Sequence, residues 1–191
     1  AYFIAAALMV PDSEILIKNV GINPTRDGLL RVCQAMGADI ALLNENYGNG
    51  EPTADLLVRH SELHGVTVGG SVIPTLIDEL PVVAALACFA RGTTVIRDAQ
   101  ELKVKESNRI DVMVNNLRAM GAHIEGTDDG MIIEGGYPLH GAIIDSHLDH
   151  RIAMTFAITA LASDGETSIK GADCVKISYP GFYEDLTRLA K

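Results

Sequence analysis

The sequence predicts an α/β (α+β) fold made of three repeated units, the third of them incomplete. The main observation is that one pattern occurs three times: an apolar helix-like run, a short break and a β-branched strand. The run and the strand cover residues 5–10 and 14–18, then 84–90 and 93–97, then 157–162 and 166–170. The copies repeat with a period of about 75 residues, which is the length of a whole supersecondary block.

A second recurrence defines the order of the elements. Residues 30–40 return as residues 114–124, and both segments read as helix, glycine and strand. Gly37 and Gly121 are the expected left-handed helix terminators, and a strand follows each of them. The repeating unit is therefore strand, helix, strand, strand, helix. In the second unit, Asp128-Asp129-Gly130 has strand patterns on both sides and predicts a hairpin.

We expect a single domain over residues 1–191, with repeats at approximately 1–70, 71–145 and 146–191. The chain stops just after the helix predicted for residues 182–190, so the later strands of the third repeat are missing from it. Either another segment supplies these strands, or a sheet edge is left open.

The composition excludes several classes of protein. With 25 acidic and 15 basic side chains, a formal net charge of −10 and no long Lys/Arg block, the chain has no source of broad attraction to nucleic acid or anionic membranes. The longest apolar runs, residues 1–10 and 82–90, fall short of the roughly 20 residues that cross a bilayer. The three scattered cysteines suit a reducing compartment, so we expect a cytoplasmic protein.

Two cations stand at the predicted start of the second repeat's helix. On a helix, Lys105 and Arg109 would share one face and repel, at the end where the dipole also disfavours cations. A solvated charged face is the ordinary explanation of such a pattern. The unfavourable placement instead favours an anion site made of the two cations and the helix amides. Glu106, between them, is well placed for proton transfer.

A second charged helix start lies at Asp149-His150-Arg151, directly before the apolar residues 152–162. Asp149 is explained as an ordinary N-cap, whereas Arg151 again opposes the helix dipole and favours an anion-binding role. An alternative is a metal cluster formed by Asp145, His147, Asp149 and His150. Their spacing matches no common zinc signature and no cysteine is near, so we expect no metal.

A third charged helix start is formed by Asp78 and Glu79, before the helix that runs to Ala90. Taken alone, two acids in a first turn are explained by the helix dipole. In a repeat fold, however, helix starts can converge on one mouth. We therefore expect one cleft to be lined by Asp78, Glu106, Arg109 and Arg151. Residues 174–180 begin the last helix in the third repeat and place Lys176 near a helix start.

Four motifs, in this order along the chain, resemble the 5-enolpyruvylshikimate-3-phosphate synthase family. They are I-D-E-L-P around Asp78, L-K-V-K-E-S-N-R-I at residues 102–110, D-H-R-I-A-M at residues 149–154, and Lys176 before S-Y-P-G-F-Y-E. The resemblance spans essentially the whole chain, but only the C-terminal half of the family's usual length. It implies one lobe of an inside-out α/β barrel, with three βαβαββ-type repeats, helices inside, and an active site between two lobes.

The resemblance also implies a reaction in aromatic amino-acid biosynthesis, on the shikimate pathway to chorismate. This reaction transfers the enolpyruvyl group from phosphoenolpyruvate to the 5-hydroxyl of shikimate 3-phosphate and releases phosphate through a tetrahedral intermediate. No metal or organic cofactor is implied. The implied partner is the missing N-terminal lobe, which holds most of the family's contacts to the 3-phosphate, while the start of the full family chain crosses back to complete this lobe.

On the shikimate side, the resemblance assigns roles to four residues. Asp78 matches the residue that contacts the shikimate hydroxyls and accepts a proton. Lys105 matches another contact at the reacting hydroxyl, and Glu106 matches the carboxyl that handles the methylene proton. Glu101 stands where many family members have an amide. A carboxylate there either alters the shikimate contacts or belongs to a glyphosate-tolerant subgroup.

On the phosphoenolpyruvate side, Arg109 and Arg151 match the family's clamp. A planar guanidinium fork suits a carboxylate better than a lysine does. His150 and Lys176 match further contacts at this ligand, with Lys176 near its phosphate.

Because half of the cleft is absent, we expect the isolated chain to show little or no turnover. Two other functions remain as alternatives. One is a lobe of UDP-N-acetylglucosamine enolpyruvyl transferase, against which the strings K-E-S-N-R and D-H-R-I-A-M speak. The other is a ligand-binding lobe that has lost turnover.

Overall fold

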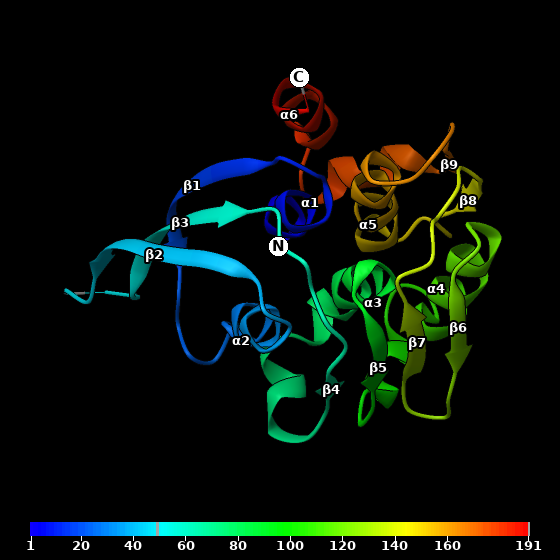
Figure 1. Cartoon of the computed structure of the whole chain (residues 1–191), viewed down its shortest axis with the longest axis horizontal. Coiled ribbons are helices and arrows are strands. Elements are labelled where there is room, and N and C mark those ends of the chain that lie inside the picture. Colours follow the sequence, from blue (N-terminus) through cyan, green and yellow to red (C-terminus); the bar gives the residue numbers. More distant parts are fainter. Residues whose placement is uncertain (49, 191) are drawn as a thin grey trace.

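The computed structural model describes residues 1–48 and 50–190, and its elements follow the predicted order (Figure 1). The α-helices are α1 (Tyr2–Met9), α2 (Gly28–Ala35), α3 (Leu80–Phe89), α4 (Arg109–Ala119), α5 (His150–Leu161) and α6 (Phe182–Leu189). The strands are β1 (Glu14–Gly21), β2 (Asp39–Asn46), β3 (Thr53–Arg59), β4 (Thr67–Val68), β5 (Gly92–Ile96), β6 (His123–Gly126), β7 (Met131–Gly135), β8 (Ile143–Asp145) and β9 (Ser168–Lys170). Short 3₁₀ helices are η1 (Gly70–Thr75), η2 (Ile77–Glu79), η3 (Gln100–Val104) and η4 (Ala172–Ile177).

Over the described residues the strands form three sheets, ordered β1-β3-β2, β4-β5-β7-β6 and β8-β9. In the second and third sheets the first strand pairs in parallel with the next, β4 with β5 and β8 with β9. The second repeat is complete and runs β4, α3, β5, α4, β6, β7. Compared with it, the described part of the first repeat lacks a strand equivalent to β4, and that of the third ends at α6.

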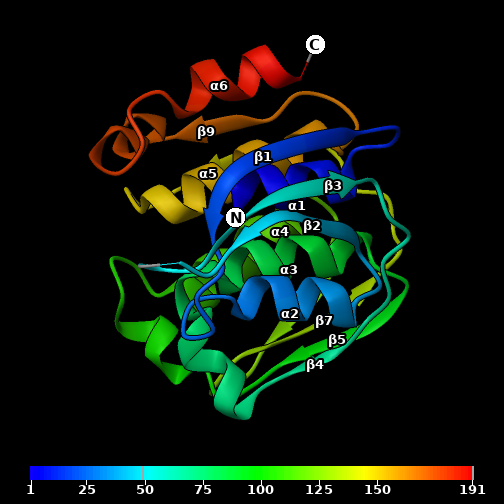
Figure 2. The same cartoon turned by 90° about the vertical axis from the view of Figure 1, so that its left-hand side faces the viewer.

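Three helices form the centre of the fold. α1, α3 and α5, one from each repeat, pack against one another. α3 is apolar on every side, and all of its residues except Phe89 are buried. A helix of this kind must be enclosed, and sheets provide the enclosure: α3 packs on β5 and β7, and α1 packs on β1 and β3 (Figure 2). These three helices are therefore inside and the sheets outside, as predicted.

Local signals in the sequence match the structure where glycine is required. Gly37 and Gly121 end their helices with φ of +89° and +91°, a region that other residues rarely adopt. The predicted hairpin joins β6 to β7, which pair antiparallel up to Gly126 and Met131. β4 and β8 pair with the strands that follow them, so pairing would place the repeat boundaries earlier than residues 70 and 145. None of the described helices is long and apolar enough to cross a bilayer.

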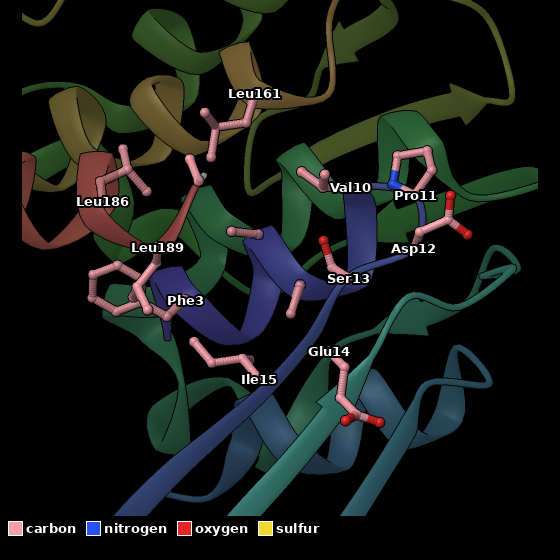
Figure 3. A pocket seen from close by; sticks show the side chains of 13 residues that line it. Phe3, Val10, Pro11, Asp12, Ser13, Glu14, Ile15, Leu161, Leu186 and Leu189 are labelled. Atoms are coloured by element: carbon pink, nitrogen blue, oxygen red, sulfur yellow. The ribbon is translucent and has the colours of Figure 1, made fainter.

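A groove of about 460 Å³ opens between α1, the start of β1 and α6 (Figure 3). Phe3 and Val10 line it from α1, and Leu186 and Leu189 line it from α6. β1 is the edge strand of the first sheet, and within the described residues β9 is paired only with β8. Over the described residues, β1 and β9 are therefore edge strands with one paired neighbour each.

Candidate active site

Arg109, the first residue of α4, lies at the centre of the candidate site and is only 1% exposed. Its guanidinium donates to three carboxylates that come from three different segments. Nε donates to Oδ2 of Asp149 at 2.8 Å, Nη1 to Oδ1 of Asp78 at 3.2 Å, and Nη2 to Oε2 of Glu106 at 2.5 Å. The starts of α3, α4 and α5 thus meet around one buried cation.

Lys105 reaches the same place by a route that the sequence does not predict. The helical face expected for Lys105 and Arg109 is wrong, because α4 begins only at Arg109, where the side chain of Asn108 caps the N–H of Asp111. Lys105 instead follows the 3₁₀ helix η3 with an extended backbone. Its Nζ lies 2.6 Å from Oε1 of Glu101 and 3.5 Å from Oδ1 of Asp78.

Arg151 completes a ring of cations around Asp78. Its Nη2 lies 3.5 Å from Oδ2 of Asp78, and its Nη1 lies 3.4 Å from Oε1 of Glu79. Asp149 accepts the backbone N–H of Arg151 at 2.9 Å, so the predicted N-cap is confirmed. α5 begins at His150, two residues earlier than predicted, and Arg151 therefore lies in its first turn. The carboxylate of Asp78 is thus contacted by Lys105, Arg109 and Arg151.

The cations set the protonation of these groups. Burial works to raise the pKa of Asp78, but Arg151, Lys105 and Arg109 outweigh it and hold the pKa below the ordinary value of 3.8. The hydrogen bond to Glu101 is the largest influence on Lys105 and raises its pKa. Burial is the largest single influence on Arg109 and opposes its charge, but Asp149, Glu106 and Asp78 together outweigh burial and raise its pKa. At neutral pH, Asp78 is therefore ionised, and Lys105 and Arg109 are charged.

Asp149 has a second role that the sequence does not reveal. It is fully buried, and besides Arg109 its Oδ2 accepts the hydroxyl of Ser107 at 3.0 Å. Burial acts to raise its pKa, and the bonds from Arg109 and Ser107 lower it overall. The N-cap pattern explains Asp149 without any ion pair, and no local signal links positions 109 and 149. Glu79, which the sequence suggests only as a first-turn acid, is a further partner of Arg151.

Two predicted site residues lie outside this network. Lys176 does not begin the last helix, because it belongs to the separate 3₁₀ helix η4 and α6 begins only at Phe182. Its Nζ pairs with Asp173 at 2.6 Å, and the Lys176 side chain is 69% exposed. His150 is half-buried beside Arg151 and takes part in no ion pair among the described residues.

Two of the residues proposed for a metal cluster, Asp145 and Asp149, are engaged in hydrogen bonds to other protein groups. Asp149 binds Arg109, and Oδ1 of Asp145 accepts the backbone N–H of His147 at 2.9 Å. The described residues contain no group of three His, Cys, Asp or Glu side chains arranged to hold a metal ion.

Removing Arg109 will destabilise the fold. Because Asp149 is fully buried, Arg109→Ala leaves an uncompensated buried charge and should lower the free energy of unfolding by about 3–5 kcal/mol. Arg151→Ala is the control: its pairs are partly exposed, so the loss should be about 1 kcal/mol or less. Urea unfolding followed by circular dichroism measures both. Equal losses for the two variants would contradict the structural role of the buried pair.

Stability should fall in acid because of Asp149. Its pKa in the folded protein is below the ordinary value of 3.8, so its contribution to stability is present above that value. The contribution is lost as the pH falls through the folded pKa. Asp149→Asn should be less stable at neutral pH and should lose less stability than the wild type on further acidification. Urea midpoints measured from neutral pH to below 3.8 test this; parallel curves would refute it.

Comparisons with known proteins agree with this geometry. The family model described as EPSP synthase (3-phosphoshikimate 1-carboxyvinyltransferase) matches residues 1–186. A 3-phosphoshikimate 1-carboxyvinyltransferase of Thermoanaerobacter pseudethanolicus is 55% identical over 189 residues, which are 99% of this chain and 45% of the relative. One from Brevibacillus brevis is 53% identical over 191 residues, which are 100% of this chain and 45% of the relative.

Solved structures give the same result. An EPSP synthase from Acinetobacter baumannii superposes with a TM-score of 0.94 and 39% identity, covering 98% of this chain and 44% of that one. The enolpyruvyl transferase NikO from Streptomyces tendae, 22% identical with a TM-score of 0.78, covers 98% of this chain and 41% of its own and shares the fold. The chain spans about half the length of the relatives it matches, and it belongs to the EPSP synthase family.

Proposed function

We propose that this chain forms the C-terminal half of a 3-phosphoshikimate 1-carboxyvinyltransferase and supplies one wall of its active site. The observation that carries the proposal is the ring of Lys105, Arg109 and Arg151 around the carboxylate of Asp78. Both substrates are anions, and clustered cations at helix starts are a means of holding them. The reaction joins the 5-hydroxyl oxygen of shikimate 3-phosphate to C2 of phosphoenolpyruvate and then expels phosphate.

Phosphoenolpyruvate would be held by the two arginines. Arg151 is partly exposed and presents a planar fork to a carboxylate. Arg109 keeps Nε on Asp149. An anion would compete for Nη1, now on Asp78, and for Nη2, now shared by Glu106 and Asp149. His150, next to Arg151, and Lys176, on the neighbouring 3₁₀ helix, would add contacts, with Lys176 toward the phosphate.

Asp78 would accept the proton of the 5-hydroxyl. In the absence of substrate its low pKa makes it a weak base, because three cations share its charge. An anionic substrate that draws these cations away would raise the pKa of Asp78 and make it a better proton acceptor. Lys105 would contact the same hydroxyl, and Glu101, its ion-pair partner, would fix the position of Lys105.

Glu106 would handle the proton at the methylene carbon of phosphoenolpyruvate. Its side chain is half exposed and bonded to Arg109, so it borders the place where that ligand would lie. In its protonated form, Glu106 would give its proton to C3 when the hydroxyl oxygen adds to C2, which produces the tetrahedral intermediate. It takes a proton back from C3 when the bond from C2 to the phosphate oxygen breaks.

The other half of the site would come from the N-terminal lobe. The relatives are about twice as long as this chain, and the open edges of β1 and β9 and the groove in Figure 3 leave room for further strands. A UDP-N-acetylglucosamine enolpyruvyl transferase is not favoured by the comparisons. A lobe that binds ligand without turnover would be revealed by the activity measurements below.

The 191-residue chain alone should release no measurable phosphate from phosphoenolpyruvate and shikimate 3-phosphate. One wall cannot position two reactants together, and positioning supplies a large part of such catalysis. A phosphate-release assay compares the chain with a two-lobe enzyme that carries it as the C-terminal half. Turnover by the chain alone at the rate of the two-lobe enzyme would disprove the shared-site proposal.

In that two-lobe enzyme, Arg151→Ala should raise the KM for phosphoenolpyruvate at least about tenfold, because a hydrogen bond between charged groups is lost. Arg151→Lys should restore only part of the affinity, since an ammonium cannot bind a carboxylate in two places. Arg91→Ala is the control: Arg91 is 76% exposed and pairs with Glu62. An unchanged KM in Arg151→Ala would refute the clamp.

A further inference from the structure

The hydroxyl of Tyr2, at the start of α1, is buried without a hydrogen-bond partner among the described residues. Its ring is fixed edge-on against Phe182 of α6, with 5.8 Å between the ring centroids. A buried hydroxyl that makes no hydrogen bond destabilises the folded state, because it loses its bonds to water without replacement. Groups of this kind are rare in folded proteins and are often retained for function.

Two arginines and one carboxylate lie near this hydroxyl. The side chain of Arg151 lies next to it, and Arg109 is close enough to influence its ionisation. A guanidinium donates hydrogen bonds and accepts none, so neither arginine can take the hydroxyl proton. Glu79 is also near, but its Oε1 lies against Nη1 of Arg151 and does not bond the hydroxyl.

The hydroxyl is a donor at neutral pH. Burial raises the pKa of Tyr2 to about 12, so the proton stays on the oxygen. A proton donor enclosed beside two cations, with no acceptor in reach, matches the oxygen atoms of an anion. α1 packs directly on α3 and α5, which fixes Tyr2 at the point where the starts of these helices meet.

We propose that Tyr2 is a further substrate-binding residue, whose hydroxyl donates to an oxygen of the anion held by Arg151. This inference rests on the proposed function, under which the anion is phosphoenolpyruvate. Tyr2 would then act together with Arg151, with its ring held by Phe182 so that little freedom is lost on binding.

Tyr2→Phe in the two-lobe enzyme tests the inference. The KM for phosphoenolpyruvate should rise about tenfold, because a hydrogen bond to a charged group is removed. The KM for shikimate 3-phosphate should stay unchanged. The Tm without ligand should be equal or higher, because the variant removes a buried hydroxyl that makes no bond. Tyr137→Phe is the matched control, since that hydroxyl is exposed and donates to Glu134, far from this site.

The possible outcomes separate this inference from the function on which it rests. If Arg151→Ala raises the KM for phosphoenolpyruvate but Tyr2→Phe does not, the role of Tyr2 is refuted and the function stands. A lower Tm with an unchanged KM would mean that chain preceding Ala1 in the two-lobe enzyme bonds the hydroxyl, which also refutes it. If the unmodified two-lobe enzyme releases no phosphate, the proposed function fails, and a Kd for phosphoenolpyruvate that Tyr2→Phe leaves unchanged would refute the role of Tyr2.

Discussion

The buried ion pair between Arg109 and Asp149 is the interaction on which the site depends. Two charges removed from water are tolerated only when each is closely paired and hydrogen-bonded, and here both conditions hold. The pair joins the first residue of α4 to the N-cap of α5, and Ser107 fills the remaining side of Asp149. If either partner shifted, the other would remain as an unpaired charge in apolar surroundings. The ion pair therefore holds the two helix starts at a fixed separation. The Nη atoms of Arg109 are thereby held toward Asp78 and Glu106.

Much of the fold could be predicted from the sequence, because its signals are local. Apolar runs, terminating glycines such as Gly37 and Gly121, and the Asp-Gly hairpin each depend on a few neighbouring residues. The apolar run and its strand also occur three times, which strengthens that prediction. The residue at which α4 begins could not be predicted from such local signals. α4 begins after the cap at Asn108, and residues that cap helices are also common inside loops, so the sequence does not distinguish this start from one before Lys105.

The site was predictable as a set of residues, but not as a network. Cations at helix starts are energetically unfavourable, and this indicated Arg109 and Arg151 before any contact was known. The offsetting carboxylates come from other segments of the chain, as the pairs from Arg109 to Asp149 and from Arg151 to Glu79 demonstrate. The N-cap role alone explained an aspartate at position 149, so nothing in the sequence indicated that Asp149 also pairs with Arg109. The unpaired hydroxyl of Tyr2 is also visible only once α1 is packed against α3 and α5.

In the network of ion pairs around Asp78 and Arg109, carboxylates outnumber cations, which is a reason to expect further cations from a second lobe. Four cations, Lys105, Arg109, Arg151 and Arg26, are paired with five carboxylates, those of Asp78, Glu79, Glu101, Glu106 and Asp149. An anion that enters this wall must therefore compete with carboxylates already in place, and it meets a net negative charge. Under the proposed function, two anionic substrates would bind such a wall only if further cations approached from the opposite side of the cleft. The carboxylates keep the cations ordered while that side is absent, and a bound substrate would replace Asp78 and Glu106 on atoms that are already positioned.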